Sequence, residues 1–202
     1  MATYVNDLRL KEIGTGESSG TWGTETNTNL ELIAEAFSFG TEAITTNADN
    51  HTTTTADGST DPGRSIYLKY TGALDSACTI TIGPNTVSKL WFIENATTDS
   101  GSSGPYNIVI SQGSGANVTI PNGHVKAIYS DGAGSGAAMV DAFTDLNLAG
   151  TTTVDVLSGS GNATIGGTLG VTGAVTANAG VSIDNITIDG TEIDLSSGDL
   201  SI

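Results

Sequence analysis

The last quarter of the 202-residue chain, residues 148–202, has apolar side chains spaced two residues apart, which is the period of a β-strand. The spaced residues are Ile165, Leu169, Val171, Val175, Val181, Ile183, Ile186, Ile188, Ile193 and Leu195. Their parity changes at Asp184-Asn185, at Asp189-Gly190 and at Ser197-Gly198, and each of these pairs is typical of a turn. The tract therefore predicts a string of short strands, each with one narrow apolar face.

A single copy of this tract has too little apolar surface to offset the entropy that it loses on ordering. Three copies wound around one axis could bury these faces against one another, with the ten spaced residues as an oligomer core. We therefore expect residues 147–202 to form a repetitive β fibre shaft, such as a β-helix, in a homotrimer. The alternative is a disordered linker, because the tract is rich in Gly, Ser and Thr. A linker, however, has no reason to keep its parity between turns.

The charge of the chain limits its partners. The formal net charge is −16 at pH 7, and the six Lys and Arg residues are scattered. This argues against binding to nucleic acid or to an anionic membrane surface, since both need clustered basic side chains. The sequence also has no apolar run long enough for a membrane span or a signal peptide, so we expect synthesis in a reducing cytoplasm and no membrane insertion.

One helix is predicted near the N-terminus. The segment Thr28-Asn29-Leu30-Glu31 matches a capping box and Gly40 is a typical helix stop, which predicts a helix from about residue 29 to residue 39. Its apolar stripe is wide, because one edge carries Leu30, Ile33 and Phe37 and a second carries Leu32, Ala36 and Phe39. Such a stripe fits contact with both its own domain and a neighbouring subunit, or an ordinary core helix.

Residues 41–146 predict a mainly β domain. Alternating apolar residues, as in Cys78-Thr-Ile-Thr-Ile82, are separated by turn residues at the spacing of a β-sandwich, and we expect a jelly-roll-like sandwich. The expected strands lie near residues 41–47, 51–56, 64–70, 77–82, 87–95, 106–111, 116–120, 123–130 and 137–143. The continuous run Leu90-Trp-Phe-Ile93 predicts a central strand that is covered on both faces.

Residues 1–40 combine a polar, glycine-containing arm with the helix. The arm carries a few bulky apolar or aromatic side chains that have no core of their own to enter, and we predict that they bind a partner. These residues are Tyr4, Val5, Leu8, Leu10, Ile13 and Trp22. Trp22, between Thr and Gly, is either folded onto its own domain or inserted into the partner.

No motif in the sequence specifies catalysis. His51 and His124 lie far apart without neighbouring ligands, and no nucleophile elbow or phosphate-binding loop is present. Asp57 and Asp61 faintly resemble a calcium loop but fit an Asx turn better. A glycan depolymerase would need paired carboxylates in a groove, and the sequence does not reveal such a pair. We expect no enzymatic activity, no cofactor and no metal.

Four segments together resemble the N-terminal part of tail-fibre and related virion structural proteins of marine tailed phages, those of cyanobacteria and SAR11-type hosts. The segments are Met1-Ala-Thr-Tyr-Val-Asn-Asp-Leu-Arg-Leu10, Gly20-Thr-Trp-Gly-Thr24, Thr26-Asn-Thr-Asn-Leu-Glu-Leu-Ile-Ala-Glu-Ala-Phe37 and Asp61-Pro-Gly-Arg-Ser-Ile-Tyr-Leu-Lys-Tyr70. The resemblance covers residues 1–145, and the tract Gly167-Thr-Leu-Gly-Val-Thr-Gly173 is more generally similar to phage fibre shafts.

The resemblance implies a homotrimeric tail fibre in the virion, made in the host cytoplasm and released by lysis. Residues 1–40 would attach to the tail or to an adaptor protein, residues 41–146 would form a collar, and the shaft would serve host adsorption, with a surface receptor as an indirect partner. Such fibres normally finish in a knob or a chaperone domain, whereas this sequence stops within its repeat pattern. The alternative function is a carbohydrate-binding or capsid-decorating β-sandwich module, in which Tyr106 or Tyr129 could stack on a sugar.

Overall fold

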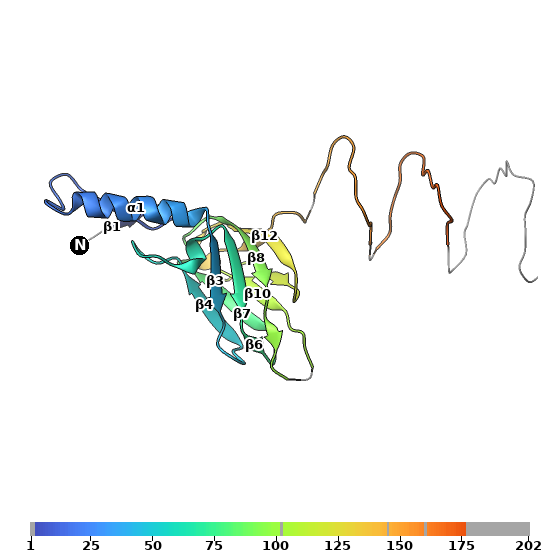
Figure 1. The fold of residues 1–202 in the computed structure, drawn as a ribbon, viewed down its shortest axis with the longest axis horizontal. Helices are drawn as coiled ribbons and strands as arrows, with labels where there is room; N and C mark the ends of the chain where they lie inside the picture. The colour runs from blue at the N-terminus through green and yellow to red at the C-terminus, as the bar shows by residue number, and fades with distance from the viewer. Residues whose placement is uncertain (1–2, 102, 145, 160, 177–202) are drawn as a thin grey trace, which may run out of the picture. The chain divides into compact units, whose positions relative to one another are not determined.

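The computed structural model describes residues 3–101, 103–144, 146–159 and 161–176, and in these ranges the chain is mainly β with one α-helix (Figure 1). The N-terminal elements are β1 (Thr3–Val5), β2 (Leu10–Glu12) and α1 (Trp22–Ala36). The remaining elements are β3 (Phe39–Ala43), β4 (Asn50–Thr54), the 3-10 helix η1 (Pro62–Arg64), β5 (Tyr67–Thr71), β6 (Ala73–Leu74), β7 (Cys78–Gly83), β8 (Leu90–Asn95), β9 (Thr98–Asp99), β10 (Ile108–Ser111), β11 (Val118–Ile120), β12 (Val125–Ser130), the 3-10 helix η2 (Gly134–Gly136) and β13 (Met139–Asp141).

The chain divides into two units, residues 1–149 and residues 150–202. All of the helices and strands above belong to the first unit. In the second unit, residues 150–159 and 161–176 contain no helix or strand, and every one of them is exposed. The strands predicted beyond residue 176 lie outside the described residues.

Two larger sheets make up most of the first unit. One has the strand order β13-β12-β8-β5-β3 and the other has the order β11-β10-β7-β4. Apart from β6 and β9, which form a separate two-stranded sheet, the chain alternates between the two larger sheets from β3 to β10, and each new strand lies parallel to the strand that preceded it in its sheet. The short pair β6-β9 is also parallel. The strands β11, β12 and β13 then pair antiparallel with their neighbours and end this winding path.

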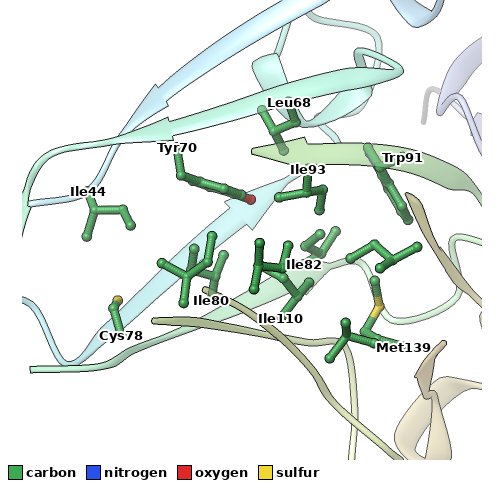
Figure 2. Close-up of a cluster of buried hydrophobic side chains, with 14 of the residues drawn as sticks. Ile44, Leu68, Tyr70, Cys78, Ile80, Ile82, Trp91, Ile93, Ile110 and Met139 are labelled. Carbon is green, nitrogen blue, oxygen red and sulfur yellow. The ribbon is translucent and has the colours of Figure 1, made fainter. Parts of the chain in front are cut away.

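Both sheets contribute side chains to one apolar core (Figure 2). Ile80 and Ile82 of β7 and Tyr70, Trp91 and Ile93 of the other sheet are fully buried in it. Two polar atoms within the core have internal partners: the indole nitrogen of Trp91 donates a hydrogen bond of 2.8 Å to the carbonyl oxygen of Gly63, and the Tyr70 hydroxyl lies 2.6 Å from that of Thr53. Burial raises the pKa of Tyr70 well above its ordinary value.

The strand positions predicted from alternation are confirmed, since each of the nine expected strands has a counterpart within a few residues. The expected pairing is wrong, because a jelly roll has antiparallel strands and most pairs here are parallel. The prediction for the run Leu90-Trp-Phe-Ile93 is half right. β8 is a central strand, but Leu90 and Phe92 are exposed while Trp91 and Ile93 are buried.

The predicted helix is confirmed as an element, and its bounds are corrected. α1 begins at Trp22, with Thr21 as N-cap, so Thr28 lies inside the helix and its hydroxyl donates to the carbonyl oxygen of Thr24 instead of capping. The helix ends at Ala36, and Gly40 belongs to β3 and is not its stop.

Candidate docking surface

Residues 3–12 form a hairpin that is attached to the helix and to the domain. In β2, the Lys11 backbone exchanges two hydrogen bonds with the Asn29 side chain, of 3.0 Å and 2.8 Å, and the Lys11 ammonium lies 2.6 Å from the Glu25 carboxylate. In the turn between the strands, Arg9 pairs with Asp57 at 2.6 Å. The arm predicted from the sequence is thus a folded hairpin held on its own domain.

Arg64 joins the hairpin, the helix and the domain at one point. Its side chain is fully buried, and its guanidinium donates hydrogen bonds to the backbone carbonyl oxygens of Leu8, Ala56 and Ser59. The Nε atom donates to a carboxylate oxygen of Glu35 in α1 over 3.3 Å. The other oxygen of Glu35 accepts from the Thr60 hydroxyl at 2.9 Å and from the backbone nitrogen of Asp61 at 2.7 Å. Because these contacts fix the last turns of α1, the face that the helix presents is fixed as well.

That presented face of α1 is apolar. Leu32 and Ala36 are buried against the domain, whereas four bulky side chains on the other edge are exposed. These four residues are Trp22, Leu30, Ile33 and Phe37. At 100° per residue they lie within an arc of roughly 80°, so they form one stripe. We call this set the helix stripe. Trp22 is 64% exposed and Phe37 is 76% exposed, so both ends of the stripe are open.

The six predicted partner-binding residues differ in their surroundings. Trp22 is exposed, as part of the helix stripe, whereas Tyr4, Val5, Leu8, Leu10 and Ile13 are half-buried in or next to the hairpin. Tyr4 has a clear local partner, because its ring lies against Gly58, whose φ is +59°. The other three members of the helix stripe were absent from the predicted set. The excess width of the apolar stripe in the sequence was the signal that pointed to them.

Four of the ten predicted oligomer-core residues lie in the described part of the second unit. Ile165, Leu169, Val171 and Val175 are all exposed there. The other six, which lie outside the described residues, are Val181, Ile183, Ile186, Ile188, Ile193 and Leu195.

The ionisable residues considered as ligands serve local structure. His51 lies 2.7 Å from the Glu42 carboxylate. Asp61 accepts a hydrogen bond from the backbone nitrogen of Gly63, as in an Asx turn, whereas Asp57 pairs with Arg9. Burial raises the pKa of Asp61. Among the described residues, no group of three or more His, Cys, Asp or Glu side chains could hold a metal ion.

Lys89 is the most perturbed cation in the described residues. Burial, with Arg64 nearby, lowers the pKa of Lys89 to about 7. Two contacts favour its charged form, since the ammonium donates to the carbonyl oxygen of Ser65 at 3.0 Å and lies 4.6 Å from the centre of the Trp91 ring. It therefore carries a charge that responds to pH near neutrality.

The tyrosines considered as a sugar platform also differ. Tyr129 is exposed on β12, whereas Tyr106 is partly buried and packs against the core. A depression of about 530 Å³ beside the hairpin contains no aromatic side chain. Its lining residues are Arg9, Thr54, Thr55, Ala56, Asp57, Gly83 and Pro84. This depression therefore lacks the flat ring on which a sugar could stack.

Comparison of the chain with protein-family models, with curated proteins and with solved structures finds no match. In the part of the chain that the structure describes, no helix has the length and apolar character needed to cross a membrane.

Proposed function

We propose that this chain is a structural protein of a phage tail fibre, without enzymatic activity. In this proposal three copies form the fibre, the N-terminal region attaches it to the tail or to an adaptor, and the C-terminal tract forms the shaft that serves adsorption to the host. The first unit acts as a collar in which the two sheets form a β-sandwich, a description supported by the core that they share.

The observation that carries this proposal is the position of the exposed apolar side chains. The first unit buries a core of apolar side chains, yet other bulky apolar side chains stay exposed on α1 and along the tract that contains Ile165 to Val175. A protein that leaves contiguous apolar surface exposed generally covers it in an assembly. Apolar surface toward both ends of the sequence fits a fibre that binds the tail with one end and its own copies with the other.

The helix stripe is the best candidate for attachment. Arg64 and Glu35 fix the helix on the domain, so the stripe is a preformed surface and loses little conformational entropy when it binds. Aromatic anchors such as Trp22 and Phe37 are enriched among residues that dominate binding energy. We therefore place the tail or adaptor contact on the helix stripe, with the hairpin beside it as a support.

Negative-stain electron microscopy of the purified full chain tests this proposal. We expect particles in which globular collar domains are grouped at one end of a slender shaft. Isolated globular particles of one chain each, without a shaft, would contradict the proposal.

The alternative, a carbohydrate-binding module, has one supporting observation, the exposed ring of Tyr129. Titration of the full chain with host surface polysaccharide separates the two functions. Saturable polysaccharide binding that is lost in Tyr129→Ala would favour the carbohydrate module. If the domain is a fibre collar, the measured polysaccharide binding should be the same for Tyr129→Ala and for the unchanged chain.

A further inference from the structure

The two sheets of the first unit have outer faces of opposite character. On the four-stranded sheet the outward side chains are mostly threonines, which suit contact with water. They include Thr52, Thr54, Thr79, Thr81 and Thr119. On the five-stranded sheet a row of apolar side chains crosses four strands in register, from Phe39 in β3 through Tyr67 and Phe92 to Ala127 in β12, and of these four Ala127 is buried. The outer face of the four-stranded sheet is therefore polar, whereas the outer face of the five-stranded sheet is largely apolar.

A second apolar row lies next to the first. Leu90, Tyr129 and Val140 are paired neighbours on β8, β12 and β13 and share the face of Phe92. Phe39 is 58% exposed and Phe92 is 37% exposed, although Phe92 is on the central strand. Their neighbours Trp91 and Ile93 point into the core instead, as Figure 2 shows. We call the two rows together the aromatic face.

The aromatic face is pre-ordered. The rings of Phe39 and Tyr67 stack with their centres 5.4 Å apart, and the Tyr67 hydroxyl donates a 3.0 Å hydrogen bond to the Glu94 carboxylate. These contacts hold the side chains in place without a partner, which reduces the entropy that binding would cost.

The charge of the face indicates its partner. The chain carries a net charge of −16, so two copies repel each other over most of their surfaces. The two rows contain no charged residue, and the charged residues next to them on the same side of the sheet, Lys69 and Glu94, pair with each other at 3.3 Å, so their charges cancel. An apolar surface with no net charge is a surface through which two copies of this acidic chain can approach without repulsion.

The order of the elements along the chain also fits a second copy of the chain as the partner. β13 is the last strand before the second unit, and it belongs to the sheet that carries the aromatic face. If three copies share a shaft, each collar domain is connected to that shaft through the residues that follow β13 in the sequence. The domains are then held at high local concentration, which favours even a modest interface.

We propose that the aromatic face is the contact between collar domains, and that its occupant is a second copy of this chain. This inference rests on the proposed trimeric fibre and locates a subunit interface outside the shaft. The central contact is Phe92, because β8 is the middle strand and its neighbours on both sides continue the apolar row.

Thiol labelling of the full chain tests this inference. The chain has a single cysteine, Cys78, which is fully buried and gives little background. Phe92→Cys places a thiol in the aromatic face, and Thr81→Cys places a matched thiol on the outer face of a central strand in the other sheet. Leu90→Cys samples the same face as Phe92 should the first variant fold poorly. The probe is a water-soluble maleimide, and the mass of each variant is measured by light scattering.

We expect the thiol at position 92 or 90 to react at least tenfold more slowly than the thiol at position 81 in the oligomeric chain, and to become equally reactive in denaturant. If the two faces are labelled at equal rates while the chain has the mass of a trimer, the collar contact is wrong and the fibre proposal still stands. Equal rates in a chain with the mass of a monomer would overturn both.

Discussion

Arg64 donates a hydrogen bond of 3.3 Å to Glu35, and the guanidinium has no exposed surface. A buried charge without a partner is costly, so this pair together with three backbone carbonyl acceptors makes burial of the guanidinium possible. The pair also connects α1 to the 3-10 helix η1, whose Arg64 follows Glu35 by 29 residues in the chain. The orientation of the helix stripe therefore depends on this ion pair together with the contacts of Glu25 and Asn29 with Lys11.

Glu35→Ala should destabilise the first unit by about 3 kcal/mol or more, because it leaves Arg64 buried without its carboxylate. Chemical denaturation followed by circular dichroism measures the change in the free energy of unfolding. The matched control is Glu31→Ala, an exposed carboxylate on the same helix, which should change it by less than about 0.5 kcal/mol. Equal effects of the two substitutions would show that the pair does not hold the helix.

Truncation of the two tryptophans should lower the free energy of unfolding by very different amounts. Trp91 is fully buried, and Trp91→Ala should cost about 3 to 5 kcal/mol of unfolding free energy. Trp22→Ala should cost less than about 1 kcal/mol, because the side chain is exposed on the helix stripe. On the proposed function, Trp22→Ala should also weaken attachment to phage tails while the mass of the isolated chain stays the same. A large loss of stability in Trp22→Ala would mean that the residue packs within its own domain.

Lys89 should make the stability of the first unit depend on pH. Its pKa is about 7 in the folded chain and close to the ordinary 10.5 in the unfolded chain, so between these values the unfolded chain binds more protons. The contribution of Lys89 to stability therefore rises with pH across this range, by on the order of 1 kcal/mol per pH unit. Lys89→Met should remove this rise. Chemical denaturation of both proteins at several pH values from 7 to 9.5, at a fixed protein concentration, measures the free energy of unfolding at each pH. Parallel pH profiles for the two proteins would refute the assignment.

Gly58 should be needed for the hairpin to lie on the domain. Its φ is +59°, and a Cβ atom there would lie 2.4 Å from the Tyr4 ring, so Gly58→Ala should displace Tyr4 and loosen the hairpin. Trypsin reports this, because Arg9 and Lys11 lie in the hairpin and should be cleaved several-fold faster. Gly123→Ala is the control, since that glycine also has a positive φ but open space around it. Faster cleavage in both variants would trace the effect to general destabilisation.

The sequence predicted the strands well because alternation reports which side chains face a core, and it does so one strand at a time. It did not predict their direction of pairing. Partners such as Phe39, Tyr67 and Phe92 lie 25 to 28 residues apart, and nothing in their own periodicity indicates a parallel or an antiparallel neighbour. The aromatic face was hidden for the same reason. Leu90 and Phe92 lengthen an apolar run that is typical of a fully covered strand, and only the folded structure shows that they are exposed.

The start of the helix was missed for a different reason. Residues 23–28 are Gly, Thr, Glu, Thr, Asn and Thr, most of which have low helix propensity, so local preference favours a later start. Tertiary contacts decide the outcome, because Glu25 accepts hydrogen bonds from Ser18 and contacts Lys11, while Asn29 binds the backbone of β2. The docking surface was therefore only partly predictable. Trp22 was identified as an isolated aromatic, but its place on a helix with Leu30, Ile33 and Phe37 depends on contacts far along the chain.

The absolute molar mass of the purified full chain, measured by light scattering, tests the central claim most directly. The fibre account predicts a particle of three chains, each of 20.3 kDa, that does not dissociate on dilution. A mass of 20.3 kDa at every concentration would contradict it, because the exposed apolar residues of the second unit would then have no copies to bury them.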